Sequence, residues 1–294
     1  MPKFLVHPAY QEAPPTRQYS MRDWGQIEDE SEIANVLRKI QTTPAFDVYT
    51  CAEDYELAYP GYNGDKIFYL EKANTGRVLY LGVGAGRIFG EIAKWNSEAI
   101  GVDNSAEMLE LLRRNCPHIK KGQLVFADAL DGSFINHQFD VIVAPYSFLQ
   151  IFGGDHLSQL LQNIYNWLKP GGMFYTDTFS PYLIPFRRKG LEVNTYSTDK
   201  NAKISIYILY NHEQQTMTEM TLINKNGTER VMKMYLHYYF PREIISALHD
   251  AGFKSSQVTG DYSGKRFDPS ENDIIVYESQ KKIPVQSLRV LHRK

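Results

Sequence analysis

The sequence predicts an α/β fold organised around a doubly wound, mainly parallel sheet. Val78–Leu81 form an apolar run typical of a buried strand. Three glycines at alternate positions follow it: Gly82, Gly84 and Gly86. Glycine allows a sharp backbone turn and the close approach of a ligand. The next residues have helical spacing, with Ile88, Ile92 and Trp95 on one side. Strand, glycine turn and helix together predict a nucleotide-binding βαβ unit.

A second predicted strand, Ala99–Val102, supports this interpretation. Asp103 stands at its end, seventeen residues after Gly86. An acid about 20 residues beyond the glycine turn is where a carboxylate binds ribose hydroxyls. The glycines do not follow the Gly-x-Gly-x-x-Gly spacing of dinucleotide sites. The spacing therefore favours a smaller ligand that lies over the turn, and a nicotinamide dehydrogenase is the less favoured alternative.

The stretch "RVLYLGVGAGRI" resembles motif I of the class I, Rossmann-like methyltransferases that depend on S-adenosylmethionine (SAM). That motif is an apolar run, an acid and then Gly-x-Gly-x-Gly. The resemblance implies SAM as the cofactor and S-adenosylhomocysteine (SAH) as its product. Tyr80 stands where the family has an acid that helps to hold the methionine end. A non-catalytic SAM-binding protein is therefore an alternative.

The following segments continue the same order of strands and helices. Leu124–Ala127 predict a third strand that ends at Asp128, and Phe139–Ala144 predict a fourth. A strongly amphipathic helix and "LKPGG" precede the fifth strand, "MFYTDTF", which also resembles the family. The expected fold is a doubly wound, seven-stranded-type methyltransferase sheet with an N-terminal helical lid and an antiparallel β insertion after strand five.

The resemblance also implies a cofactor site. It consists of lid tyrosines, the glycine turn and residues at the ends of the strands: Tyr55, Tyr59, Gly82, Gly84, Gly86, Asp103, Asn104, Met108, Asp128, Ala129 and Ala144. Asp128 corresponds to the family residue that hydrogen-bonds the adenine amino group. A lid tyrosine, by position Tyr59 with Tyr55 next, contacts the methionine part. Both tyrosines have the alternative role of packing the lid on the core.

Five regions are expected along the chain. Residues 1–75 form an N-terminal arm and lid, with a helix after Asp29, and residues 76–180 form the SAM-binding core. Residues 181–240 carry three antiparallel strands and an Asn226-Gly227 hairpin signal, and they resemble the substrate-covering insertion of small-molecule methyltransferases. Residues 241–280 return to the core, and residues 281–294 are a basic tail.

Methyl transfer from a sulfonium requires mainly alignment, and an oxygen acceptor also needs a base. The catalytic candidates are Tyr146, in the "APYSF" segment after strand four, and His237 on the cover strands. His156 is a further candidate base. Methyltransferases of nucleic-acid bases often carry Asp/Asn-Pro-Pro-Tyr at this point, whereas this chain has Ala144. This difference argues against an adenine N6 enzyme.

Composition limits the remaining alternatives. The chain has 294 residues, a net charge of −2 and two cysteines, so it has neither a strong pull toward nucleic acid nor a disulfide framework. No metal constellation is seen, and no segment has the length of a membrane span. We expect a cytoplasmic enzyme that methylates an N or O atom of a small molecule. A homodimer is an assembly that the sequence leaves open. A nucleic-acid or protein methyltransferase is the alternative.

Overall fold

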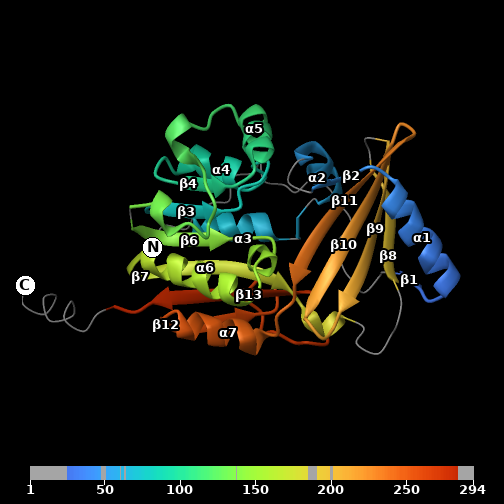
Figure 1. The fold of residues 1–294 in the computed structure, drawn as a ribbon. Coiled ribbons are helices and arrows are strands. Elements are labelled where there is room, and N and C mark those ends of the chain that lie inside the picture. Colours follow the sequence, from blue (N-terminus) through green and yellow to red (C-terminus); the bar gives the residue numbers. More distant parts are fainter. Residues whose placement is uncertain are drawn as a thin grey trace, which may run out of the picture.

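The computed structural model describes residues 25–47, 51–59, 61–62, 64–136, 138–184, 191–198 and 201–283. The first 24 residues of the expected N-terminal arm and the expected basic tail from residue 284 onward lie outside the described residues. The described strands form two sheets, which stand side by side and are joined by helices and loops (Figure 1).

In the described residues, the larger sheet has seven strands in the order β12-β13-β7-β6-β3-β4-β5. These strands are β3 (Val78–Leu81), β4 (Ile100–Asp103), β5 (Leu124–Phe126), β6 (Phe139–Ala144), β7 (Leu168–Phe179), β12 (Phe253–Thr259) and β13 (Ile274–Lys281). The five from β7 to β5 are parallel, and β13 pairs antiparallel with β7. The predicted core, with five strands in chain order, is confirmed. The order reverses between β3 and β6, and ligands of open α/β sheets bind at such a switch point.

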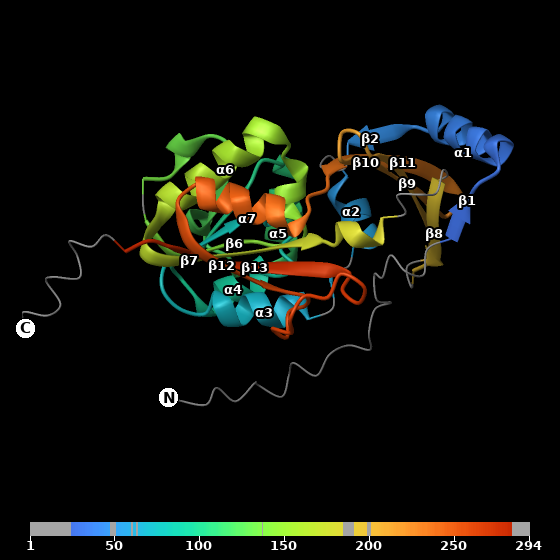
Figure 2. The ribbon, with the colours of Figure 1, turned by 90° about the horizontal axis from the view of Figure 1, so that it is seen from below.

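Helices cover both faces of this sheet (Figure 2). On one face lie α6 (Gly154–Trp167) and α7 (Pro241–Asp250), which bury Leu160, Leu161 and Ile244 against it. On the other lie α3 (Asp65–Lys72), α4 (Phe89–Trp95) and α5 (Ala106–Asn115). The central strand β3 is buried along its whole length, because helices shield both of its faces.

The second sheet, here called the cover sheet, has the order β1-β8-β9-β10-β11-β2 in the described residues. Its strands are β1 (Gly25–Ile27), β2 (Ala45–Asp47), β8 (Leu191–Ser197), β9 (Ala202–Asn211), β10 (Thr216–Lys225) and β11 (Thr228–His237). The predicted antiparallel insertion is therefore confirmed, with β8 as an additional strand. The N-terminal region adds β1 antiparallel to β8 and β2 parallel to β11. Strands this short carry too few residues for a period-two pattern, so the sequence did not reveal them.

Helix α1 (Glu30–Thr42) packs on the face of the cover sheet that is turned away from the core. Asp29 caps it by accepting the Glu32 N–H at 2.8 Å. Ile40 of α1 packs with Met220 and Leu222 of β10 and with Val231 of β11. The opposite face of the cover sheet is turned toward the core, and the cavity described below lies on that side.

The lid helix α2 (Ala52–Ala58) lies between the two sheets and is fixed to both parts. Buried Asp54 pairs with Arg230 of β11, with 2.7 Å between Oδ1 and Nη2. Glu53 pairs with Arg114 of α5 at 3.1 Å. A buried ion pair therefore holds α2 to the cover sheet, and an exposed ion pair holds it to the core.

The boundary between α6 and β7 differs from the expectation. The sequence predicts that the helix extends to Lys169 and is stopped by Pro170-Gly171-Gly172. In the structure α6 ends at Trp167, and Leu168 is already extended. Lys169 pairs with Asp140 of β6 at 2.8 Å, so it belongs to the sheet. The pairing between β6 and β7 is irregular at this point, which absorbs the extra residues.

Replacing Ile142 with alanine will test the core. Ile142 lies in the centre of β6 and is fully buried, so Ile142→Ala will lower the free energy of unfolding by about 2–5 kcal/mol. The measurement is urea unfolding followed by circular dichroism. Ile245→Ala on the exposed side of α7 is the control and will change stability by less than about 0.5 kcal/mol. Equal losses in the two variants would contradict this packing.

Candidate active site

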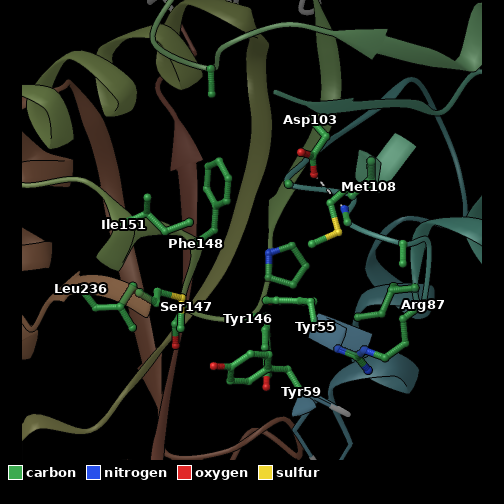
Figure 3. Close-up of a pocket in the computed structure, with 18 of the residues that line it drawn as sticks. Tyr55, Tyr59, Arg87, Asp103, Met108, Tyr146, Ser147, Phe148, Ile151 and Leu236 are labelled. Carbon is green, nitrogen blue, oxygen red and sulfur yellow. Dashed lines mark hydrogen bonds between the residues drawn. The ribbon is translucent and has the colours of Figure 1, made fainter. Parts of the chain in front are cut away.

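One cavity lies where the carboxyl ends of β3, β4 and β6 face the cover sheet (Figure 3). Its lining includes most of the predicted site residues: Tyr55, Tyr59, Gly82, Gly84, Asp103, Asn104, Met108, Asp128, Ala129 and Tyr146. The other half of the lining comes from the cover sheet, with Ile208, Met217 and Leu236 among its side chains. The cavity thus has one half at the glycine turn and another half at the cover sheet.

Gly84 and Gly86 have different structural roles in the turn. Gly84 has φ +52°, and a Cβ built on it would meet no described atom within 4 Å. The backbone at Gly84 is therefore open toward the cavity. Gly86 does not line the cavity, because a Cβ there would approach Leu112 Cγ of α5 at 2.9 Å. Gly86 allows α5 to pack closely, whereas Gly84 leaves room for a ligand.

Asp103 is fixed at the edge of this turn. One carboxylate oxygen accepts the N–H of Gly84 and the other accepts the N–H of Ser105, both at 2.9 Å. Burial raises the pKa of Asp103, and these backbone N–H groups oppose the rise. An ionised carboxylate has about four acceptor positions, so it can also bind two neighbouring hydroxyls. Ser105 caps α5 by accepting the Met108 N–H, which places Met108 on the cavity wall.

Tyr80 is buried at the position where a motif acid is expected, and its ring packs on Phe89. The charged residue at this end of the cavity is instead Arg87, directly after the glycine turn. Its guanidinium is held by both carboxylate oxygens of Asp65 of α3, the Nη1–Oδ1 distance being 2.9 Å. The sequence analysis did not identify Arg87, although its position next to Gly86 was a signal. An arginine fits a ligand carboxylate.

Tyr146 lies at the boundary between the two halves (Figure 3). Tyr146 and Ser147 both have left-handed backbone conformations, with φ +62° and +59°. Both N–H groups donate to the carboxylate of Asp177, at 2.9 and 2.8 Å, and the Tyr69 hydroxyl donates to it at 2.6 Å. Burial raises the pKa of Asp177 to about 6, and these three donors oppose the rise. The buried acid therefore stabilises a strained turn.

The lid tyrosines reach into both halves. The rings of Tyr55 and Tyr59 are 4.7 Å apart. The Tyr59 hydroxyl donates to the carboxylate of Glu219 in β10 and lies 2.8 Å from the Thr221 hydroxyl. Sequence reasoning missed Glu219, which lines the cavity. The signal was a single acid inside the strand pattern "MTEMTLI", on the same face as Met217 and Thr221.

Two further predicted residues do not reach the cavity lining. Ala144 is fully buried in the core, and its carbonyl accepts the Thr176 hydroxyl at 2.7 Å. His237, a predicted catalytic residue, packs against Gly153, where a Cβ would come within 2.2 Å of its ring. His237 is therefore not among the residues that line this cavity, because the end of β11 directs it toward the start of α6. His156 is exposed on α6 and is also absent from the lining.

Among the described residues, no cluster of three or more His, Cys, Asp or Glu side chains could hold a metal ion. No helix in this part of the chain is long and apolar enough to cross a membrane.

A doubly wound sheet, a glycine turn open to a cavity and an acid after the second strand are features that class I SAM-dependent methyltransferases have. Residues 78–172 match the family model described as a methyltransferase domain. The open backbone at Gly84, the Asp103 carboxylate and the Arg87 cation fit the hydroxyls and the carboxylate of SAM. Over residues 78–172, the methyltransferase class predicted from the sequence, with SAM as its cofactor, is confirmed.

Solved structures share the fold. The CcbJ methyltransferase from Streptomyces caelestis superimposes with a TM-score of 0.70 and 22% identity, covering 80% of this chain and 98% of that one. SAM-bound CalS10, an amino pentose methyltransferase from Micromonospora echinaspora, gives a TM-score of 0.54 and 15% identity, covering 85% and 97%. Both superpositions extend beyond the matched domain.

One curated relative has a closer sequence. The biotin biosynthesis bifunctional protein BioHC of Cellvibrio japonicus is 31% identical over 121 residues, which is 41% of this chain. The chain spans only 23% of that relative's length.

Replacing Gly84 with alanine will test the open turn. Gly84→Ala will weaken SAM binding roughly tenfold or more, about 1.4 kcal/mol, because the new methyl group occupies ligand space. The control is Gly227→Ala at the β10–β11 hairpin, where φ is +81° and a Cβ also meets nothing. Both variants acquire left-handed strain, but only Gly84→Ala loses affinity by calorimetry. Equal affinities in the two would contradict the placement.

Asp103→Ala will test the ribose-binding acid. Loss of hydrogen bonds to a charged group, worth about 1.5–3 kcal/mol each, will weaken SAM binding roughly ten- to a hundredfold in calorimetry. Asp131→Ala is the control, since Asp131 is exposed and also accepts an N–H, from Ser133 at 2.9 Å. A folded Asp103→Ala protein with the affinity of the parent would show that the cofactor lies elsewhere.

Proposed function

We propose that the chain transfers a methyl group from SAM to a nitrogen or oxygen atom of a small molecule. The observation that carries this proposal is the shared cavity, in which the glycine turn faces the cover sheet. The cover half is mostly apolar, with Ile208, Met217, Met234 and Leu236 around one carboxylate, Glu219. Such a mixture is typical of sites for small molecules. CalS10, which shares the fold, is described as an amino pentose methyltransferase, and this description favours the same substrate class.

In this proposal the core half binds the cofactor. Asp103 accepts the ribose hydroxyls, and the open backbone at Gly84 lies beneath the nucleoside. Met108 and Ala129 supply apolar contacts for the base, with Asp128 at the rim. Arg87 faces the methionine carboxylate. Arg87, which Asp65 holds in place, thus supplies a positive charge at the end of the cavity where Tyr80 replaces the family's acid.

SAM supplies a methyl group already activated on a sulfonium, so the chain's own residues need only bind, orient and exclude water. Positioning of reactants contributes at most roughly 7–11 kcal/mol to such a step. Tyr146 is suited to positioning because Asp177 holds its backbone rigidly. Burial raises the pKa of Tyr59, Tyr62 and Tyr146 above their usual value. These phenols stay protonated and act as hydrogen-bond donors, not as bases.

Two measurements test the proposal. Calorimetry with purified protein will show SAM and SAH binding at about 10 μM or tighter, near −7 kcal/mol. Incubation with methyl-labelled SAM and a panel of small amines and alcohols, alongside oligonucleotides and a protein mixture, will place the label in the small-molecule fraction. Label found only in the nucleic acid or protein fraction would contradict the small-molecule assignment. A folded protein that binds neither SAM nor SAH would contradict the activity.

A further inference from the structure

Glu219 occupies the centre of the cavity-facing side of the cover sheet. It lies in β10 directly opposite Ile208 of β9 and Met234 of β11. Met217 precedes it by two residues on the same face, and all of these side chains line the cavity. The side chain is only 4% exposed. One carboxylate thus stands in an otherwise apolar wall.

The partners of this carboxylate are neutral. The Tyr59 and Thr221 hydroxyls are its hydrogen-bond partners in the described part of the chain, and both meet Oε1. No described residue donates to Oε2, and no described cationic side chain forms an ion pair with Glu219. Two other buried acids differ in this respect, because Asp54 pairs with Arg230 and Asp65 pairs with Arg87. Asp177 also lacks a cation, but donors meet both of its carboxylate oxygens.

An acid buried without a cation is costly while it is ionised. Burial raises the pKa of Glu219 to about 7, and the Tyr59 and Thr221 hydroxyls oppose the rise. The titratable groups that act on Glu219 from the packed elements are tyrosines: Tyr59 directly after α2, Tyr62, Tyr146, Tyr196 of β8 and Tyr210 of β9. Each has its pKa raised and is uncharged near neutral pH. Arg87 lines the same cavity, but it forms its ion pair with Asp65 and none with Glu219.

We propose that Glu219 is the acceptor-binding acid: it pairs with the ammonium group of an amine substrate and removes a proton from it. In this step an N–H bond of the ammonium breaks and the proton passes to the free oxygen Oε2. The electron pair stays on nitrogen, which becomes the neutral nucleophile. The carboxylic acid returns its proton to solvent before the next turnover. The inference rests on the proposed function and narrows the acceptor atom from nitrogen or oxygen to nitrogen.

The chemistry of the group favours an amine over an alcohol. An ammonium supplies the positive charge that no described side chain gives to Glu219, so binding it relieves the cost of the buried charge. A carboxylate that titrates near neutral pH is also well matched to proton transfer at that pH. An alcohol brings no charge and leaves the acid as unpaired as before.

The first measurement separates this inference from the proposed function. Calorimetry will compare SAH binding to the parent protein, to Glu219→Gln and to Glu192→Gln. Glu192 is the matched control because it also accepts a tyrosine hydroxyl, from Tyr210 at 2.8 Å, but lies outside the cavity lining. All three proteins will bind SAH alike. Absence of SAH binding in the folded parent would overturn the proposed function itself.

The second measurement uses matched probes on the SAH-loaded proteins: n-hexylamine with n-hexanol, and 2-phenylethylamine with 2-phenylethanol. The amines will bind the parent and Glu192→Gln at least tenfold tighter than the alcohols, and Glu219→Gln will lose this preference. The inference is overturned if no amine binds the SAH-loaded parent, if amine and alcohol bind alike, or if Glu219→Gln retains the amine preference.

The pH dependence of methylation provides a further readout with the tightest-binding amine. The carboxylate must be ionised to take a proton, so kcat/KM of the parent will fall as the pH drops below about 7. Glu219→Gln will have a lower kcat/KM, and its kcat/KM will not show this fall at low pH. Its pH profile will reflect only the titration of the amine itself. Parallel pH profiles for the two proteins would contradict the proton-transfer role, because a purely structural glutamate would leave the shape unchanged.

Discussion

The carboxylate of Asp177 is the interaction on which the geometry of the cavity depends. It is fully buried near the carboxyl end of the long strand β7, and it joins three parts of the chain. Through the Tyr69 hydroxyl it fixes α3, which carries Asp65 and thereby Arg87. Through two backbone N–H groups it fixes the turn at Tyr146 and Ser147. Removal of this acceptor would leave two buried N–H groups unpaired, each at a cost of about 1–3 kcal/mol.

The same turn links the core to the lid. The Ser147 hydroxyl lies 2.9 Å from the Tyr62 hydroxyl, and the rings of Tyr62 and Tyr146 are 4.6 Å apart. The lid helix α2 is in turn held to the cover sheet by the Asp54–Arg230 pair and by the Tyr59–Glu219 hydrogen bond. The strained backbone of one turn therefore positions aromatic side chains from both halves of the cavity, which is how strain is used at ligand sites.

The core and most of its site were predictable because they depend on local signals. The strand β3, its glycine turn and Asp103 lie within 26 residues (78–103), and hydrophobic runs mark the other parallel strands. The residues that were missed depend on contacts between distant segments. Glu219 meets Tyr59 across 160 positions, and Asp177 meets Tyr69 across 108. No local pattern shows which buried acids will find a cation.

The replacement of the motif I acid by Tyr80 can be understood from the distribution of charge in the cavity. Tyr80 removes an acid from the core half, where Arg87 and its partner Asp65 now provide the charged group. Glu219 places an acid in the cover half, about which the described residues arrange only neutral phenols and hydroxyls. Electrostatic complementarity therefore favours an anionic group beside Arg87 and a cationic group beside Glu219.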